Sequence, residues 1–295
     1  MLWGQKGDDT MNIETVTQAS TAIETSAVQL NAMNPEKLAN FYQVNMGMTL
    51  LEQRDDAFVL GTATGRVLLE LYQADSYKEA NKAGLYHFAL LLPSRADLGA
   101  ILRYLLERGV ELTGASDHGY SEALYLDDPE GNGIEIYADK DRSVWDIQDN
   151  GLIAGVVEPM DAEGVLASAQ DAFADLPEGT VMGHIHLHVG DLAQTLAFYH
   201  EILGLGLKYV MGQQALFMAT GASHHHLGAN LWNGVDIKAG AEGSQGLRAS
   251  IWQANAEDFA RIKARLDEEG YAYQEEPKQI ALVDPAGTRL LIQVA

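Results

Sequence analysis

In several short runs of the chain, apolar and polar residues alternate with the two-residue period of a β-strand. Each run is followed by a stretch with the periodicity of a helix. The run AVQLNAM at 27–33 has the pattern of a β-strand with one buried face. In 98–106 and 259–266 the apolar residues instead recur every three or four positions, which predicts two amphipathic helices. Gly109 and Gly270 follow these helices, as a helix-ending glycine should. The chain is therefore expected to be an α+β protein.

The same order of elements occurs more than once. Segments 27–73 and 184–234 both begin with a strand-like run, continue into a helix that contains the pair Phe-Tyr, and reach a glycine before further strand-like runs. The offset between the two segments is 157 residues through Gly47 and Gly204. Such a fixed offset indicates an internal repeat.

A second pair of segments, 84–138 and 246–294, has its own features. The two begin with GLYHFALLLP and GLRASIWQ, and they close on strands joined by the matching turns DPEG and DPAG. Each of the four segments thus reads as one strand, one helix and about three strands. A unit of roughly 50 residues cannot bury both faces of a sheet alone. We expect four βαβββ units that pair into two curved, mostly antiparallel sheets.

These boundaries predict a domain organisation. Residues 1–24 are polar and weakly patterned, and we expect a flexible tail there. Units one and two would form a first domain at 25–145, and units three and four a second domain at 181–295. The stretch 146–180 would connect them and contains an Ala-rich helical piece, DAEGVLASAQDAFADL.

The amino-acid composition excludes some classes of binding partner, but it does not indicate which reaction the protein catalyses. The chain has 295 residues, 47% of them hydrophobic, and its net charge of −23 argues against nucleic acid or an anionic membrane surface as a partner. The absence of cysteine excludes disulfides and thiolate catalysis and fits a reducing cytoplasm. With no apolar run of transmembrane length and no signal-peptide profile, we expect a cytoplasmic protein with a small-molecule partner; a homo-oligomer stays open.

Several segments resemble a known family. GLYHFALLLP, SEALYLDDPEGNGIEIYAD, RSVW, MGHIHLHV and the HHH run are similar to segments of the vicinal-oxygen-chelate superfamily, which includes glyoxalases, extradiol dioxygenases and antibiotic-resistance binding proteins. Within it, the chain most resembles the Bacillus-type catechol-2,3-dioxygenases. The resemblance covers nearly the whole chain from about residue 25. It implies the vicinal-oxygen-chelate fold.

In this superfamily the metal ligands come from the first and last strands of the units. The corresponding residues, first-strand and then last-strand, are Ala27, His87, His184 and Ala249, and Glu70, Glu135, Asn230 and Leu291. The resemblance therefore implies a metal site formed by His87, Glu135 and His184, which requires units two and three to pair. Two imidazoles and one carboxylate are the ligand set of non-haem Fe(II) oxygenases, so we expect Fe(II), with Mn(II) as the alternative. Glu70 is expected to be structural or solvent-facing.

The resemblance also implies acid and base groups, because extradiol ring opening moves protons to and from the substrate. Tyr125 lies ten residues before Glu135, at the spacing of an active-site tyrosine in extradiol enzymes, and His118 lies seven residues before Tyr125. The run 223–227 (SHHHL) aligns with a paired-histidine segment, and the alignment gives His226 as the acid–base residue. Taken singly, each could be a core or loop residue; together they favour a dioxygenase.

Two residues are expected in the wall of the substrate cleft. His186 shares a strand face with His184, because side chains alternate along a strand. Trp232 could supply an apolar wall, although a place in the core is the commoner role for a tryptophan. His188 is assigned to structure.

The implied reaction is the opening of a catechol ring by O2 beside its two hydroxyl groups. Three alternatives stay open. A glyoxalase-type metal-dependent isomerase or lyase would use the same chelate geometry, usually with a fourth protein ligand. A non-catalytic antibiotic-binding protein of this fold typically lacks the full ligand set. A hydroquinone dioxygenase would use units one and four, which here carry Ala27, Ala249 and Leu291.

Overall fold

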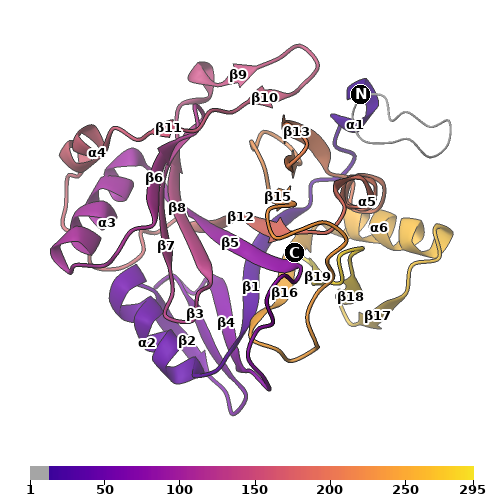
Figure 1. The fold of residues 1–295 in the computed structure, drawn as a ribbon, viewed down its shortest axis with the longest axis horizontal. Helices are drawn as coiled ribbons and strands as arrows, with labels where there is room; N and C mark the ends of the chain where they lie inside the picture. The colour runs from indigo at the N-terminus through magenta and orange to yellow at the C-terminus, as the bar shows by residue number, and fades with distance from the viewer. Residues whose placement is uncertain (1–12) are drawn as a thin grey trace.

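The structure, a computed structural model, describes residues 13–295 and contains four repeats of one strand, one helix and three strands (Figure 1). Unit one comprises β1 (Glu24–Ala32), α2 (Pro35–Met46), β2 (Thr49–Gln53), β3 (Ala57–Gly61) and β4 (Val67–Gln73). Unit two comprises β5 (Gly84–Leu91), α3 (Arg95–Glu107), β6 (Gly114–Asp117), β7 (Ser121–Asp127) and β8 (Gly133–Asp139).

The second half of the chain repeats this order. Unit three comprises β12 (Val181–His188), α5 (Leu192–Ala197) with its π-helical continuation η2 (Phe198–Ile202), β13 (Gly206–Met211), β14 (Ala215–Ala219) and β15 (Leu227–Asn230). Unit four comprises β16 (Gly246–Ala254), α6 (Ala256–Glu268), β17 (Tyr273–Glu276), β18 (Gln279–Val283) and β19 (Arg289–Val294). The connector holds η1 (Arg142–Val144), β9 (Asp146–Ile147), β10 (Ile153–Ala154), β11 (Glu158–Pro159) and α4 (Ala162–Ser168).

The units pair across the two halves of the chain. Strand β5 of unit two is antiparallel to β12 of unit three, and they lie inside a nine-stranded sheet of order β11-β6-β7-β8-β5-β12-β15-β14-β13. Strand β1 of unit one is antiparallel to β16 of unit four in an eight-stranded sheet of order β17-β18-β19-β16-β1-β4-β3-β2. The expected pairing of units two and three is therefore confirmed, and so is the α+β architecture with two mostly antiparallel sheets.

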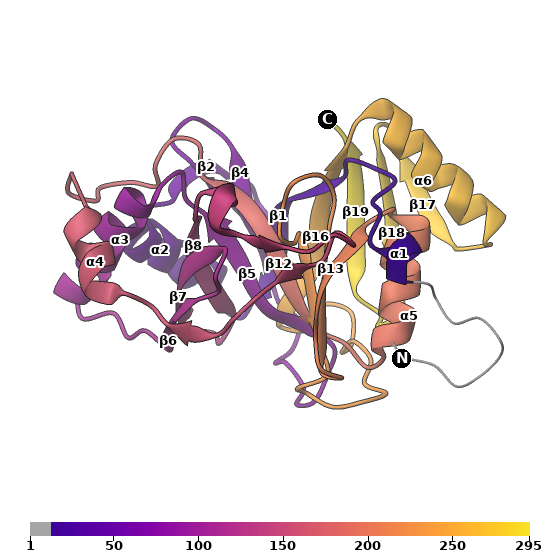
Figure 2. The same ribbon diagram turned by 90° about the horizontal axis from the view of Figure 1, so that it is seen from above.

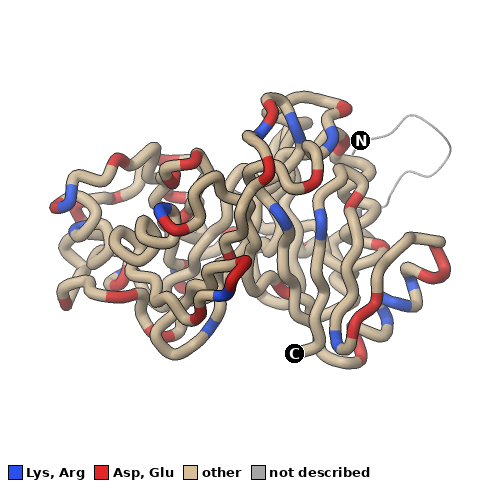
Figure 3. The backbone as a smooth tube through the Cα atoms, turned by 90° about the horizontal axis from the view of Figure 1, so that it is seen from below, with Lys and Arg blue, Asp and Glu red and all other residues tan. Residues whose placement is uncertain are grey.

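Helices of the two halves lie at opposite ends of the molecule. Figure 2 shows α2, α3 and α4 at one end and α5 and α6 at the other, with the sheets between them. Acidic positions are spread along the backbone through both ends (Figure 3), as the net charge of −23 requires. None of the described helices is long and apolar enough to cross a membrane.

Two matching hydrogen bonds connect the units within each half. The hydroxyl of Tyr42 in α2 donates to Asp128 at the DPEG turn of unit two, with an O–O distance of 2.7 Å. The hydroxyl of Tyr199 donates to Asp284 at the DPAG turn of unit four, at 3.1 Å. Both bonds are buried. In each half of the chain, the tyrosine of the Phe-Tyr pair is thus hydrogen-bonded to the aspartate of the Asp-Pro turn. The division of the chain into two domains stays a prediction.

The tail and the connector differ in part from expectation. Residues 1–12 lie outside the described residues. A flexible tail was expected at 1–24, but its later part is packed against the protein. Val16 and Ile23 are buried, and the backbone N–H of Ser20 donates to the carbonyl of Gly204 at 2.9 Å. Two further hydrogen bonds attach the segment to unit three: the hydroxyl of Thr21 donates to the carbonyl of Leu203 at 2.7 Å, and the hydroxyl of Thr220 donates to the carbonyl of Ile23 at 2.8 Å. In the connector, α4 spans 162–168 and is shorter than the Ala-rich stretch suggested.

Candidate metal centre

Three adjacent strands bring His87, Glu135 and His184 together. The order β8-β5-β12 places Glu135 and His184 in the two strands that flank β5. Both are register partners of Ala89, so a small residue separates them. His87 lies two positions before Ala89 and therefore on the same face of the sheet. The alternation along β5 and the pairing of the two halves thus fix the three side chains around one point.

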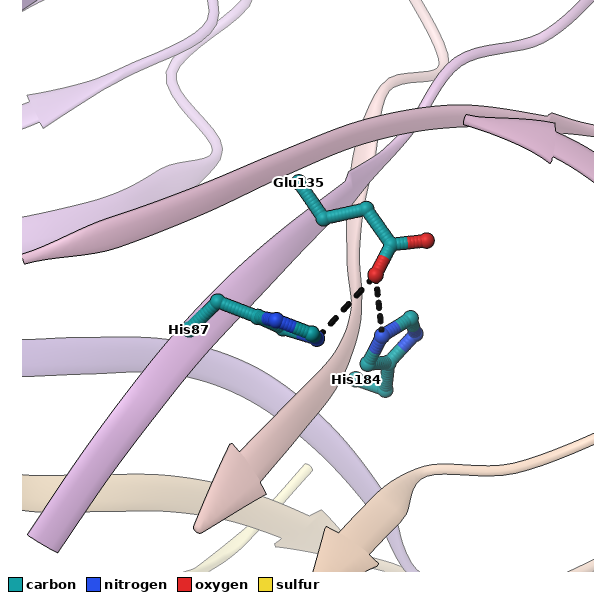
Figure 4. A group of neighbouring side chains, drawn as sticks. All are labelled: His87, Glu135 and His184. Carbon is teal, nitrogen blue, oxygen red and sulfur yellow. Dashed lines mark hydrogen bonds and ion pairs between the residues drawn. The ribbon is translucent and has the colours of Figure 1, made fainter. Parts of the chain in front are cut away.

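The ligand atoms converge on that point. Oε2 of Glu135 lies 3.0 Å from Nε2 of His87 and 3.1 Å from Nε2 of His184 (Figure 4). One potential ligand atom from each residue lies within 4.8 Å of the others, and all three residues are buried. Among the described residues this is the one group of three or more such side chains close enough to hold a metal.

Two buried atoms of this group lack hydrogen bonds in the described structure. Nε2 of His87 is close to Glu135 but is not aligned for a hydrogen bond, and Nδ1 of His184 has no partner. Buried polar atoms are almost always paired, so an unpaired nitrogen that points at a carboxylate and a second imidazole suits a ligand for a cation. The residues therefore fit a metal ion.

The protonation states suit a metal as well. Burial alone would raise the pKa of Glu135, but its contacts with His184 and His87 outweigh burial and hold that pKa well below the usual value. Burial lowers the pKa of His184 to about 4. A carboxylate that stays ionised and an imidazole that stays neutral are the forms that coordinate metals.

A cavity of about 380 Å³ adjoins the triad, and His87 and Glu135 form part of its wall. His118, Tyr125, His186 and Trp232, all singled out by the sequence, line it as well. The cavity thus collects the expected metal ligands and most of the expected acid–base and cleft residues; the roles of these residues stay predictions.

His118 and Tyr125 form a hydrogen-bonded pair in the wall. Nδ1 of His118 lies 2.9 Å from the carbonyl oxygen of Val156, and Nε2 lies 2.6 Å from the hydroxyl oxygen of Tyr125. A carbonyl can only accept, so Nδ1 of the neutral ring carries the proton and Nε2 accepts from the Tyr125 hydroxyl. Burial and the nearby Glu135 raise the pKa of Tyr125 well above its usual value, so the phenol stays protonated.

The histidine run places His225, not His226, in the cavity wall. The ring of His225 lies against that of His184, with 4.0 Å between the ring centroids. His226 is not among the residues that line the cavity, and its Nδ1 accepts a hydrogen bond from the backbone N–H of Thr220 at 3.3 Å. The structure therefore places the residue before the expected one in the cavity wall, in the run that precedes β15, and the identity of the acid–base residue stays a prediction.

A hydrogen-bond chain fixes the proton on His225. Oδ1 of Asp139 accepts from Nε2 of His224 at 3.0 Å, and Nδ1 of His224 lies 2.6 Å from Nδ1 of His225. A carboxylate accepts, so the neutral His224 ring carries its proton on Nε2 and offers a lone pair at Nδ1. His225 must then donate from Nδ1. Its Nε2 is left as a proton acceptor.

Asn230 engages the other two histidines of β12. Its Oδ1 accepts from the backbone N–H of Trp232 at 3.0 Å and from Nδ1 of His188 at 2.8 Å. That orientation directs the amide nitrogen to Nε2 of His186, at 3.0 Å. The lone pair of His186 is therefore occupied by a hydrogen bond instead of being offered to a metal, and His188 has the structural place expected for it.

Other parts of the wall were not found from the sequence. Tyr86 of β5 packs at the mouth, with 5.2 Å between its ring centroid and that of Trp232. The wall also includes residues 155–157 of the connector and Tyr209, Met211 and Phe217 of unit three. These wall residues carry no motif of catalytic or metal-binding residues, so the sequence alone did not mark them as part of a cavity.

Comparison with known proteins gives a consistent result. The family model described as the Glyoxalase/Bleomycin resistance protein/Dioxygenase superfamily matches residues 25–136 and 181–282. A protein of Bacillus subtilis (strain 168) named catechol-2,3-dioxygenase is 38% identical over 264 residues, which cover 87% of this chain and 92% of that protein.

Two solved structures share the fold at low identity. Glyoxalase I from Zea mays has a TM-score of 0.59 and 17% identity, with 92% of each chain covered. The cppA protein from Streptococcus pneumoniae TIGR4 has a TM-score of 0.55 and 17% identity, with 95% of this chain and 100% of that chain covered. At this identity the likeness extends to the fold alone.

Proposed function

The chain belongs to the glyoxalase/bleomycin resistance protein/dioxygenase superfamily, and we propose that it is an extradiol dioxygenase that opens catechol-type diols with O2. The observation that carries this proposal is the arrangement of the cavity wall. A buried His-His-carboxylate group lies between a proton acceptor on one side, His225, and a hydrogen-bonded tyrosine on the other, Tyr125. The name of the relative that is 38% identical supports the same class of reaction.

The metal would be held by Nε2 of His87, Oε2 of Glu135 and Nε2 of His184. Three protein ligands leave room for substrate oxygens and O2 on a metal such as Fe(II), which is our first choice, with Mn(II) as the alternative. When bound, the metal supplies the Lewis acidity and redox chemistry that join diol and O2. Asn230 stays with His186 and His188, which supports a set of three protein ligands over the four usual in glyoxalase-type enzymes.

His225 would act as the acid–base residue in place of His226. With its Nδ1 proton donated to His224, its Nε2 accepts a proton from a diol hydroxyl. The Nδ1 proton can then pass to His224, whose Nε2 proton can pass to Asp139. Proton return along the same chain would reprotonate His225 for the later step that needs an acid.

Tyr125 would hold the diol from the opposite side. It is the register partner of Glu135 in the neighbouring strand, which places it beside the metal position. Its phenol stays protonated, and its one proton is donated to Nε2 of His118, so the hydroxyl would have to turn this proton toward an anionic substrate oxygen in order to stabilise it. His118, bound to the carbonyl of Val156, positions that hydroxyl.

Oxygen uptake tests the function. The protein, purified anaerobically and loaded with Fe(II), should consume O2 and form a yellow ring-opened product with catechol and 4-methylcatechol. Glu135→Gln and His184→Ala should abolish both metal binding and turnover, whereas the control His200→Gln, outside the cavity wall, should retain them. Turnover that survives Glu135→Gln would refute the site. Isomerisation of a thiol-aldehyde adduct without O2 uptake would instead place the protein with the glyoxalases.

A further inference from the structure

The cavity is larger than a bare catechol requires. Its volume of about 380 Å³ falls within the range of roughly 300–1,000 Å³ that is typical of sites for drug-sized ligands. A single benzene ring with two hydroxyl groups would fill only the part next to the triad. The remainder of the cavity must be occupied by water or by a substituent on the ring.

Part of the cavity wall is apolar. Val156 and Val157 of the connector, Met211 of β13, Phe217 of β14 and Trp232 after β15 contribute to its wall. Phe217 bridges the polar and apolar parts, with its ring centroid 5.0 Å from that of His225 and 5.7 Å from that of Tyr209. A substituent that extends from the diol toward the mouth would therefore meet aliphatic and aromatic side chains.

The mouth exposes apolar surface that the fold does not cover. Twelve large hydrophobic residues are exposed in the described chain, and four of them, Tyr86, Val156, Val157 and Trp232, line this cavity. Val157 is 64% exposed and Trp232 is 46% exposed. A concentration of exposed apolar residues around a cavity marks a binding surface for an apolar group.

The charges of the wall point in the same direction. Asp127 and Glu135 are acidic, and no Lys or Arg occurs among the described residues that line the cavity. A carboxylate on the substituent would lose its hydration shell there without gaining a cationic side chain, and it would meet the like charge of Asp127, whereas the metal would offset the charge of Glu135. The cavity is therefore poorly suited to an acidic diol.

We propose that the substrate is a catechol with an uncharged alkyl or aryl substituent, and that Val156, Val157, Phe217 and Trp232 bind this substituent. The inference rests on the proposed function for the diol end and adds the chemistry of the other end. Acidic diols such as 3,4-dihydroxyphenylacetate would be turned over poorly.

The test compares three diols with the Fe(II)-loaded protein: 4-methylcatechol, 4-tert-butylcatechol and 3,4-dihydroxyphenylacetate. We expect KM to fall from the methyl to the tert-butyl compound, and kcat/KM for the acidic diol to be lower than for either by at least about tenfold, since 1.4 kcal/mol of lost binding has that effect. Binding is read independently by quenching of tryptophan fluorescence under argon, and Trp232→Phe should remove most of that signal.

A charge introduced at the mouth sharpens the test. Val157→Lys adds a cation at an exposed position where the fold tolerates a long side chain, and it should raise kcat/KM for the acidic diol severalfold while slightly weakening the tert-butyl compound. The control Leu106→Lys places the same charge at a similarly exposed position, 52%, on α3 and away from the cavity wall, and should change neither.

The possible failures are distinct. Ring opening with the acidic diol preferred, or Val157→Lys without effect on that diol, would overturn the inference and leave the proposed function intact. Binding of 4-tert-butylcatechol without ring opening of any diol would overturn the proposed function and retain the apolar site. Equal binding of all three diols would overturn the substituent preference.

Discussion

Asp139, the last residue of β8, accepts a hydrogen bond from Nε2 of His224 at 3.0 Å and so connects the partly exposed end of a strand to a buried pair of histidines. The ring of Tyr120 stacks on His224, with 4.3 Å between centroids, and holds it in this orientation. Glu135 lies on the same strand as Asp139. One strand thus supplies both a proposed metal ligand, Glu135, and the residue that sets the proton position on His225.

Asp139→Asn should slow turnover without removing the metal. An amide at this position can donate to His224 and permits the opposite proton arrangement, in which Nε2 of His225 no longer accepts. We expect kcat to fall about 10- to 100-fold, as for other residues that orient a group at a metal site, with KM nearly unchanged. Steady-state kinetics and metal content are the measurements. The control Asp149→Asn changes an exposed carboxylate of the connector, and equal kcat values for the two variants would contradict the orienting role.

Substitution of two adjacent histidines separates the acid–base residue from its neighbour. His225→Asn should lower kcat by about 100- to 10,000-fold, the range for loss of a general acid–base group. His226→Asn should leave kcat within a fewfold of the unmodified protein, because an asparagine oxygen can accept the Thr220 N–H in place of Nδ1. The opposite ranking would restore His226 to the role that the sequence assigned to it.

His226 should contribute to acid sensitivity instead. Burial lowers its pKa to about 3, whereas an unfolded histidine titrates near 6.5, so below that pH the unfolded chain binds a proton that the folded protein refuses. Stability is therefore lost as the pH falls from about 6.5 toward 3. Urea unfolding of metal-free protein should show a decrease between pH 7.5 and 5.0 that is smaller in His226→Asn by about 1–2 kcal/mol. The same decrease in both proteins would show that His226 protonates freely in the folded state.

Metal binding should stabilise the fold through Glu135. A ligand that binds only the folded protein adds about 2.7 kcal/mol at a free concentration of 100 times Kd. Mn(II) should therefore raise the urea midpoint of the unmodified protein and leave Glu135→Gln unchanged. The control Glu70→Gln alters the equivalent position of unit one, where Glu70 pairs with Arg54 at 3.0 Å, and should retain the metal effect. A loss of the effect in both variants would point to a different binding mode.

His118 and Tyr125 should behave as one unit in a double-mutant cycle. Their hydrogen bond is 2.6 Å long, so His118→Gln and Tyr125→Phe each break the same contact. We expect the double variant to lose less kcat/KM than the product of the two single losses, as residues in contact usually do. Strict multiplicativity would mean that the two side chains act on the substrate separately.

The unit order could be predicted because it follows from a repeat in the sequence. The grouping of His87, Glu135 and His184, and with it the pairing of units two and three, came from the resemblance to a known superfamily. The placement of His225 rather than His226 in the cavity wall could not be predicted, for a physical reason. Period-two alternation assigns faces only inside a strand, and the run 223–226 precedes β15, which begins at Leu227.

The outer wall of the cavity could not be predicted for a related reason. Residues 155–157 belong to the connector, where neither helical nor strand periodicity reports on the direction of a side chain. Val156 contributes through its backbone carbonyl to His118, a contact that is independent of side-chain type. The burial of Val16 and Ile23 could not be predicted either, because two apolar residues in a polar segment do not show the periodicity of a helix or a strand.

The nested pairing of strands sets an order of assembly during synthesis. All three proposed metal ligands and the β5–β12 contact are present once the chain has been made to the end of β12, at His188. Strand β1 is made first, yet one of its two neighbours, β16, begins only at Gly246. Until β16 has left the ribosome, the backbone N–H and C=O groups along one edge of β1 lack their partner strand. Such an unpaired edge can bind a strand of another chain and so promote aggregation. The nine-stranded sheet of units two and three can therefore form on a nascent chain whose eight-stranded sheet still lacks unit four.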